Sequence, residues 1–404
     1  MKKSMALRQA AMSGPSLRNI LSGYKVFLMI WPCLLWMTTA CIEEYTPEIS
    51  RSQQLLIVDG GITSEPGPYT VRLSLSKGIQ DVFTEPVSGA VVVIEEKNGS
   101  SEVLSEVDPG RYETATGGIT GKIGNEYRIS ITHNDEGYES AWMLLKDCPP
   151  IDSLYWMRER HQGVNGEIDG IQWYIDTHDP DNNTRYYRWE YIEDWAFSVP
   201  ISSSWNPTLC YAHNPSSGII IGSTEKFTDD LLLKHPITYV DHTTTRLTLR
   251  YRIIVIQHAI TEEEFRYWEA LEELNENLGT LFDPIPAEIY GNIRNVTNPD
   301  RSVLGYFTSS TVRTDTMYVD AEEFANAPIY FDSPYGFCNF VVIAGDRNPA
   351  ISNYYRAGWL LADTIRDAGI LYTTMANSRY CFDCTTAGNA DPPADWIPLN
   401  PGNQ

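Results

Sequence analysis

Residues 69–76, Tyr-Thr-Val-Arg-Leu-Ser-Leu-Ser, decide the fold class of this chain. Val71, Leu73 and Leu75 alternate with polar residues, and this period of two is typical of a β-strand with one buried face. Similar strand patterns occur at residues 55–59, 87–95 and 127–132, and Asp108-Pro-Gly marks a turn before a further strand. Short strands at a spacing of about ten residues, separated by turns, predict a β-sandwich over residues 54–147.

The rest of the chain, residues 148–404, is predicted to form a larger β-rich domain that begins at Cys148-Pro-Pro. Alternating apolar residues at 171–177, 185–199, 247–260, 302–307 and 340–344 indicate strands. One segment, residues 261–278, has helical spacing instead. Thr261-Glu-Glu-Glu264 predicts a capping box at its start, in which the Thr261 hydroxyl and the Glu264 carboxylate each accept a backbone amide. Gly279 predicts its end.

The first 40 residues predict an export signal. Five basic residues and no acidic residue lie in positions 1–25, and an uncharged apolar run follows from Val26 to Ala40. The run is shorter than the ~20 residues that a membrane-spanning helix requires. Thr38-Thr-Ala precedes Cys41, as in a lipoprotein cleavage site. We therefore expect a mature protein that begins at a lipidated Cys41 and continues through a tether at 41–53.

Charge excludes one class of partner. The chain has 30 Lys and Arg against 53 Asp and Glu, a formal net charge of −23, and removal of the signal takes this to −28. Such a surface repels phosphate backbones, so we expect no nucleic-acid partner. It suits solubility outside the cell, cationic ligands or divalent ions. Hydrophobic residues make up 42% of the chain, which is enough for folded cores.

Five cysteines follow Cys41, and an exported chain is expected to oxidise them. We expect Cys381 and Cys384 to be joined to Cys210 and Cys338, in a pairing that the sequence does not specify, with Cys148 left free. A zinc site and a redox site are the alternatives. The zinc spacing would be unusual, and no helix pattern follows Cys384 as a thioredoxin-like motif would need.

No catalytic constellation stands out. Asp179, Asp181 and Asn183 alternate as in the first half of a calcium loop, but the required glycine is missing, so a hairpin turn explains them better. The seven histidines show no metal-binding spacing, and we find no nucleophile elbow or phosphate loop. We therefore expect neither an enzyme nor a cofactor. The aromatic stretches at 173–174 and 186–191 either form a core or line a groove.

Several segments together resemble a known family. The sandwich motifs Gly89-Ala-x-Val, Gly110-x-Tyr and Gly124-x-x-Tyr-x-Ile are similar to carboxypeptidase-regulatory and immunoglobulin-like modules. The whole mature chain resembles Bacteroidota outer-membrane lipoproteins of unknown function that are encoded beside TonB-dependent receptors. The segments that carry this likeness are Cys41, Pro149-Pro-Ile-Asp-Ser-Leu, Asp179-Pro-x-x-Asn-x-x-Tyr-Tyr-Arg-Trp, Phe265-x-Tyr-Trp, Leu281-Phe-Asp-Pro, Gly291-Asn-Ile, Val303-Leu-Gly-Tyr-Phe, Cys381-x-Asp-Cys384 and Trp396. Cys148 and Asn389 depart from the family pattern.

The resemblance implies a location and a role. Acidic residues after the lipidated cysteine act as a surface-export signal in such proteins, and Glu43 and Glu44 occupy that place; an acidic linker is the plainer explanation. The chain is therefore expected to be held in the outer membrane by its lipid anchor and to face the exterior. There it would act as an accessory of a TonB-dependent receptor that captures an unknown nutrient. The alternative is a structural or adhesive surface protein.

Overall fold

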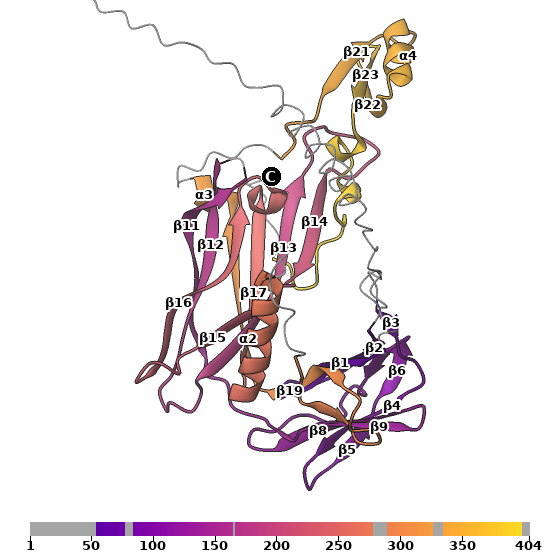
Figure 1. The fold of residues 1–404 in the computed structure, drawn as a ribbon. Helices are drawn as coiled ribbons and strands as arrows, with labels where there is room; N and C mark the ends of the chain where they lie inside the picture. Colours follow the sequence, from indigo (N-terminus) through magenta and orange to yellow (C-terminus); the bar gives the residue numbers. More distant parts are fainter. Residues whose placement is uncertain (1–53, 77–83, 165, 278–288, 326–333, 398–404) are drawn as a thin grey trace, which may run out of the picture. The chain divides into compact units, whose positions relative to one another are not determined.

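The computed structural model describes residues 54–76, 84–164, 166–277, 289–325 and 334–397 (Figure 1). Strands dominate these residues and several antiparallel sheets form, so the predicted mainly β fold class is confirmed. The predicted export signal and tether, with Cys41, Glu43 and Glu44, lie outside the described residues. Two short helices, α3 (Ala321–Ala325) and α4 (Pro349–Arg356), accompany the predicted one.

Two six-stranded sheets form the sandwich. Sheet A consists, in order, of β19 (Val303–Ser310), β1 (Leu56–Thr63), β2 (Thr70–Leu75), β7 (Arg111–Glu113) and β6 (Ser105–Asp108), with β3 (Glu85–Pro86) on β2. Sheet B consists of β18 (Ile293–Asn295), β9 (Glu136–Ser140), β8 (Glu126–His133), β4 (Val91–Glu96) and β5 (Ser101–Val103), with β10 (Met143–Leu144) on β8. Val71 and Leu73 are buried in the core between the sheets, and Arg72 is exposed, as their alternation predicts.

The sandwich also takes two strands from far along the chain. Each sheet of the segment predicted at 54–147 receives one of them, β18 or β19. β19 runs parallel to β1, with Val58 opposite Gly305. Gly305 has φ +101°, and a Cβ there would lie 1.8 Å from the Val58 carbonyl oxygen, so only glycine allows the two strands to come this close. Local alternation carries no information about such a distant pairing.

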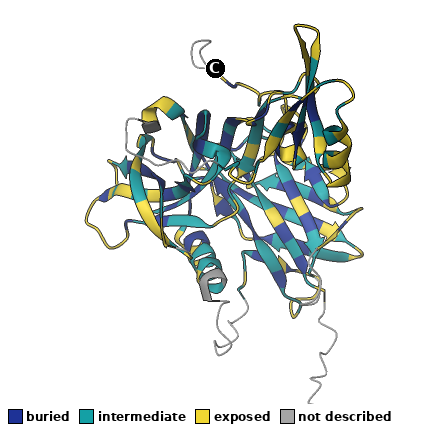
Figure 2. Cartoon of the chain, turned by 90° about the horizontal axis from the view of Figure 1, so that it is seen from above, coloured by how far each residue is buried: buried dark blue, intermediate teal, exposed yellow. Residues whose placement is uncertain are grey.

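The larger region contains two more sheets. Sheet C consists of β11 (Ile151–Gly163), β12 (Gly166–Asp179) and β16 (Asp230–Asp241). Sheet D consists of β14 (Leu209–Pro215), β13 (Tyr186–Ser198), β17 (Arg250–Ala259) and β20 (Val312–Asp320), with β15 (Ile220–Ser223) on β13. Side chains of both sheets share a core in which Trp173, Trp189 and Tyr251 are buried. Figure 2 shows the resulting alternation of buried and exposed residues along the strands.

A smaller sheet and the tail complete the chain. Sheet E has the order β21 (Phe340–Ala344), β23 (Ile370–Ala376), β22 (Leu360–Asp367), and α4 precedes β22. The tail then crosses sheet D, where the Trp396 ring packs edge-on against Tyr211 and Tyr318. Its indole is 8% exposed. The Arg252 guanidinium lies 5.6 Å from the Trp396 ring centre. The tail is therefore fixed by aromatic packing as well as by the disulfides described below.

Candidate functional site

Helix α2 (Glu262–Asn277) lies between sheet A and sheet D, against the faces of these sheets that point away from their own cores (Figure 1). Tyr267 packs on Tyr306 of sheet A, with ring centres 5.0 Å apart, and Phe265 packs on Tyr186 of sheet D at 5.2 Å. The buried side of the helix, which carries Glu264, thus faces the junction of the two sheets, whereas Glu262, Glu263 and Arg266 are exposed. Charged and polar groups gather at this junction. The residues that surround each group in the sequence have an ordinary composition.

The capping box at the start of α2 forms only in part. The Glu264 amide donates to the Thr261 hydroxyl at 3.2 Å, as predicted. The Glu264 carboxylate does not turn back to the cap, and that part of the prediction is wrong. It is fully buried and accepts hydrogen bonds from the Thr308 hydroxyl at 2.8 Å and the Trp268 indole at 3.3 Å. Burial raises the pKa of Glu264, although Arg188 opposes this.

Arg188 and Glu190 face the same junction from β13. The Arg188 guanidinium donates to the Glu190 carboxylate at 2.5 Å and lies 4.9 Å from the centre of the Trp268 ring. The Arg188 side chain is only 13% exposed, whereas that of Glu190 is 45% exposed. Burial by itself would raise the pKa of Glu190, but the charge of Arg188 more than offsets it and the pKa is lowered. Glu190 therefore stays ionised beside solvent.

His258 of β17 lies opposite Arg188 in the register of sheet D. Its ring is buried, and Nδ1 lies 3.1 Å from the Ser310 hydroxyl. Burial, with the positive charge of Arg188 acting in the same direction, lowers the pKa of His258 to about 3. The imidazole is thus neutral. Nε2 of His258, Nε of Arg188 and Oε2 of Glu264 have no hydrogen-bond partner among the described residues.

A cleft of about 480 Å³ opens beside this cluster, and we call it the junction cleft. Asp59 of β1, Trp268 of α2, and Arg188 and Glu190 of β13 contribute to its lining. The other residues that line it are Trp189, Tyr191, Ile192, Pro215, Ser216, Ser217, Gly218, Ile219, Ile220 and Ile256. The volume is within the ~300–1,000 Å³ of ligand sites in proteins. Ile192 and Ile256 lie on the same face of sheet D as Glu190, so the lining places apolar side chains beside a carboxylate and suits a small amphipathic molecule.

The aromatic stretches of the larger region divide between core and cleft. Tyr187 and Trp189 point into the core between sheets C and D, where both are buried. Arg188 and Glu190 alternate with them and point to the opposite face of β13. No contiguous motif identifies the cluster, because its members come from three elements, β13, β17 and α2. The only available signal was the charged pair between buried aromatic residues.

The calcium candidates form a turn. The Asp179 carboxylate accepts the backbone amides of Asp181 at 3.0 Å, and of Asn183 and Thr184 at 2.8 Å each. The Lys146 ammonium lies 3.4 Å from the Asn183 carbonyl oxygen, which places a positive charge beside the turn. Among the residues that the structure describes, no group of three or more His, Cys, Asp or Glu could hold a metal ion. Asp179 therefore fixes the turn between β12 and β13. These two strands belong to sheets C and D and do not pair with each other, so the turn is not the hairpin that the sequence predicts.

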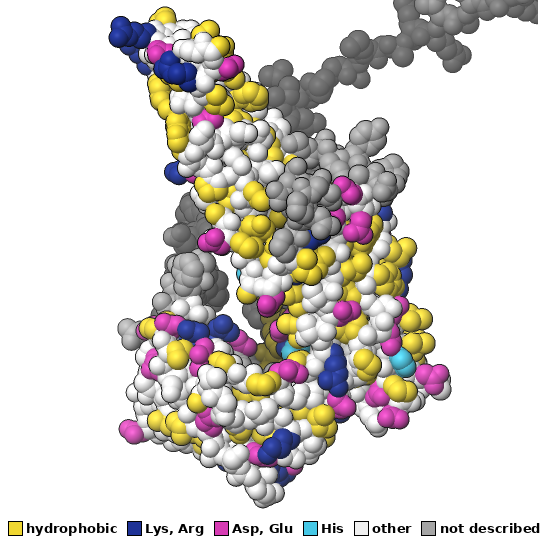
Figure 3. All heavy atoms as spheres, turned by 180° about the vertical axis from the view of Figure 1, so that it is seen from behind, with side chains coloured by type: hydrophobic (Ala, Val, Ile, Leu, Met, Phe, Trp, Pro, Cys, Tyr) yellow, Lys and Arg dark blue, Asp and Glu magenta, His cyan; other side chains and the backbone are white. Residues whose placement is uncertain are grey.

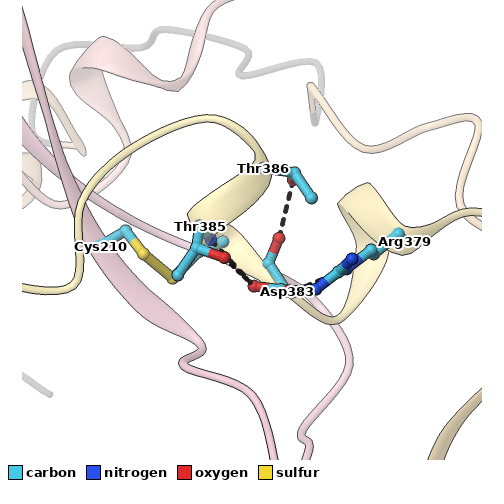
Figure 4. The surroundings of a disulfide bond; sticks show 6 residues. Cys210, Arg379, Asp383, Thr385 and Thr386 are labelled. Carbon is cyan, nitrogen blue, oxygen red and sulfur yellow. Dashed lines mark hydrogen bonds and ion pairs between the residues drawn. A yellow bond between two sulfur atoms is a disulfide. The ribbon is translucent and has the colours of Figure 1, made fainter.

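Four cysteines form two disulfides, Cys210–Cys384 and Cys338–Cys381. Figure 4 shows Asp383 beside the first of them. The Asp383 carboxylate accepts the Thr385 amide at 3.0 Å and Arg379 Nε at 2.8 Å. Burial would raise the pKa of Asp383, but these hydrogen bonds outweigh it and the pKa is lowered.

The fifth cysteine, Cys148, remains a thiol in the interior. It is fully buried, and burial raises its pKa to about 12. Its thiol donates to the Gln257 carbonyl at 3.5 Å. A neutral, enclosed thiol of this kind does not act as a nucleophile. The structure therefore gives Cys148 a packing role.

Three findings complete the description. Within the described ranges, no helix is both long and apolar enough to cross a bilayer. A comparison with curated proteins found no match. A family model does match residues 42–316, a region that contains the sandwich, α2 and every residue of the junction cleft, and that ends within β20. Because the match extends over about two thirds of the sequence, the chain belongs to the family described as a domain of unknown function, DUF4249.

Proposed function

We propose that this protein is a surface-exposed outer-membrane lipoprotein that captures a small nutrient in the junction cleft and passes it to a TonB-dependent transporter. The role is non-enzymatic. The observation that carries the proposal is the cleft itself, which combines residues of the sandwich, α2 and sheet D around a buried polar cluster. The predicted lipid anchor at Cys41 and the acidic pair Glu43 and Glu44 support the location.

The lining favours a ligand with an apolar body and a positively charged or hydrogen-bond-donating end. Among the described lining residues, Asp59 and Glu190 carry two negative charges against the one positive charge of Arg188, so an excess carboxylate remains after Arg188 pairs with Glu190. The exposed Arg72 guanidinium lies 3.8 Å from Asp59, outside the lining. Ile192, Ile256 and Pro215 supply apolar surface in the same lining. The net charge of −23 also raises the local concentration of cations around the molecule. Small organic amines fit this description, and carboxylic acids do not.

The test of capture is a calorimetric titration of the purified protein with a panel of hydrophobic amines and with the matching carboxylic acids. We expect binding of amines that is weakened at least tenfold, about 1.4 kcal/mol, in Asp59→Asn/Glu190→Gln. The matched control is Glu167→Gln/Asp229→Asn, which removes two exposed carboxylates outside the cleft. Equal binding of amines by both variants, or binding of acids alone, contradicts this assignment.

The test of delivery uses the bacterium that encodes the protein. A tagged copy purified from outer membranes should recover a TonB-dependent transporter, and deletion of the gene should reduce uptake of the ligand. A structural or adhesive surface role is the alternative. It predicts binding to surfaces or matrix, no transporter in the purified fraction and unchanged uptake after deletion.

A further inference from the structure

The Arg188 guanidinium occupies a position in the junction cleft that has the composition of a cation site. It lies 4.9 Å from the centre of the Trp268 ring and donates to the Glu190 carboxylate at 2.5 Å. A carboxylate and the face of an aromatic ring around one positive group are the elements by which proteins bind organic cations. Trp268 and Glu190 both line the cleft, so the protein's own side chain fills a place that a ligand can reach. We call Trp268 and Glu190 the cation seat.

Trp268 keeps its position without help from Arg188. Its indole N–H donates to the Glu264 carboxylate at 3.3 Å, and its ring packs edge-on against Tyr267 with ring centres 5.2 Å apart. The backbone of Glu190 is fixed by the pairing of β13 with β17. The cation seat is therefore expected to remain when Arg188 leaves it.

The same cluster offers Arg188 a second set of partners. Nε of Arg188, Oε2 of Glu264 and Nε2 of His258 are buried and have no hydrogen-bond partner among the described residues. His258 lies opposite Arg188 in the register of sheet D, and Glu264 accepts from the indole on which Arg188 stacks. Nε2 of His258 is an acceptor in the tautomer whose Nδ1–H donates to Ser310. One buried donor and two buried acceptors are thus unpaired within one cluster, which is unfavourable.

A turn of Arg188 towards Glu264 and His258 would pair these atoms. It would also bring the guanidinium charge closer to a carboxylate whose pKa is raised by burial, a rise that Arg188 already opposes. The turn sacrifices the contacts of Arg188 with Trp268 and Glu190, so two sets of contacts compete for one side chain. A cation that fills the seat in place of Arg188 restores those contacts and shifts the balance towards the second position.

We propose that the ligand of the junction cleft carries a guanidinium group, which replaces Arg188 in the cation seat while Arg188 turns to Glu264 and His258. The group that fills the seat identifies the chemistry of the ligand. A planar guanidinium stacks on an indole and pairs with a carboxylate through two parallel N–H groups, whereas an ammonium does not. The surface charge also favours a cation, because Figure 3 shows acidic side chains spread over the face it draws, in a chain of net charge −23. The inference rests on the proposed function and narrows its organic cations to guanidino compounds with an apolar body.

The experiment is a calorimetric titration of the full-length protein with pentylguanidine and with pentylamine. Arg188→Gln empties the cation seat, Glu264→Gln weakens the second set of partners, and a double variant combines the two changes. The matched control is Arg266→Gln, which removes one positive charge from α2 at a side chain that is 44% exposed and outside the cleft lining. The unfolding midpoint of each variant is compared with that of the wild type. If Arg188→Gln lowers the midpoint, Arg188→Met takes its place, because methionine keeps the apolar stem and removes the charge and the donors.

We expect the wild type to bind pentylguanidine at least about threefold more tightly than pentylamine. Arg188→Gln should lower the Kd for pentylguanidine at least about fivefold, because no side chain then competes for the seat, whereas the control should stay within about twofold of the wild type. Glu264→Gln should raise the Kd at least about threefold in the wild-type background and leave it unchanged in the Arg188→Gln background, because only Arg188 uses the second set of partners. A merely structural effect of Glu264→Gln would weaken binding in both backgrounds.

The inference is overturned if Arg188→Gln binds pentylguanidine no more tightly than the wild type does, or if the control gains as much affinity. A preference for pentylamine, or an equal effect of Glu264→Gln in both backgrounds, would also overturn it. In each of these cases, binding of the cations by the wild type leaves the proposed function standing. Absence of cation binding in the wild type and in every variant overturns both. Binding by Arg188→Gln alone supports the cation seat and contradicts capture by the native protein.

Discussion

Removal of the Cys210–Cys384 disulfide should destabilise the protein more than removal of any other side-chain link near the tail. The bond joins residues 174 positions apart, and Cys338–Cys381, with a separation of 43, lies within that loop. When the inner bond is intact, the outer loop effectively contains about 130 residues. The chain-entropy relation then gives about 5 kcal/mol for the outer bond, against about 4 kcal/mol for the inner one.

These figures translate into an unfolding midpoint. The unfolding entropy is near 2.1 cal/mol/K per residue, so a folded region of roughly 320 residues has an unfolding entropy of about 0.7 kcal/mol/K. A loss of about 5 kcal/mol therefore lowers the unfolding midpoint by about 7 °C. The variant Cys210→Ala/Cys384→Ala should melt lower by about this amount in non-reducing buffer. Cys148→Ala is the matched control, because it removes another fully buried sulfur without breaking a link.

The assay is calorimetry of four proteins, each with and without reductant: the wild type, Cys210→Ala/Cys384→Ala, Cys338→Ala/Cys381→Ala and the control Cys148→Ala. Reductant breaks both disulfides, so it should lower the wild-type midpoint below that of either double alanine variant in non-reducing buffer. Cys148→Ala should show the same loss as the wild type, because it retains both disulfides. A midpoint for Cys210→Ala/Cys384→Ala within 2 °C of the control would refute the reasoning. Peptide mapping that recovered Cys210 joined to Cys338 or Cys381 would refute the pairing itself.

Three further changes test individual contacts. Thr261→Ala should lower the unfolding free energy by about 1 kcal/mol, because the Thr261 hydroxyl accepts a hydrogen bond from the Glu264 amide. Thr261→Ser should retain this stability, and equal unfolding midpoints for the two variants would rule out the cap. The pKa of His258 in the folded protein lies below its unfolded value of ~6.5, so the stability that the neutral imidazole contributes is complete above pH 6.5 and is lost as the pH falls towards 3. His258→Gln should therefore reduce the slope of unfolding free energy against pH, between pH 6.5 and 5, by up to about 1.4 kcal/mol per pH unit. An unchanged slope would contradict this prediction. Trp396→Ala should cost about 3 kcal/mol and expose the tail to proteolysis, whereas Trp396→Phe should cost much less because the indole N–H has no partner among the described residues.

Sequence patterns within one short segment predicted several strands and the long helix. The alternation of Val71 and Leu73 identified a sandwich strand, and Tyr187 and Trp189 identified the buried face of β13. The helix was predicted at 261–278 and found at 262–277, because its cap and its apolar spacing both lie within one short segment. The hairpin of β22 and β23 was not predicted, since its outward face is as apolar as its inward face and the alternation is lost.

The candidate site could not be predicted in the same way. Glu264 resembles a capping residue in sequence, and only the position of Thr308, more than 40 residues later, shows where its carboxylate goes. His258 has no second histidine at a metal-binding spacing, so a search for paired histidines does not identify it. The burial that lowers its pKa comes from strands paired across the whole chain. Disulfide pairing has the same limit, because two different connectivities join Cys381 and Cys384 to Cys210 and Cys338.

The long-range pairing of the sandwich has a consequence for how the chain is made. β1 and β9 lie near the start of the folded region, and each finds its outer neighbour, β19 or β18, only after residues 148–292 have been added. A nascent chain that has reached residue 147 carries two unpaired strand edges, which readily pair with other chains. A fragment that ends at residue 147 is therefore expected to aggregate. In the full chain, the sandwich is completed only after the residues that line the junction cleft have been synthesised.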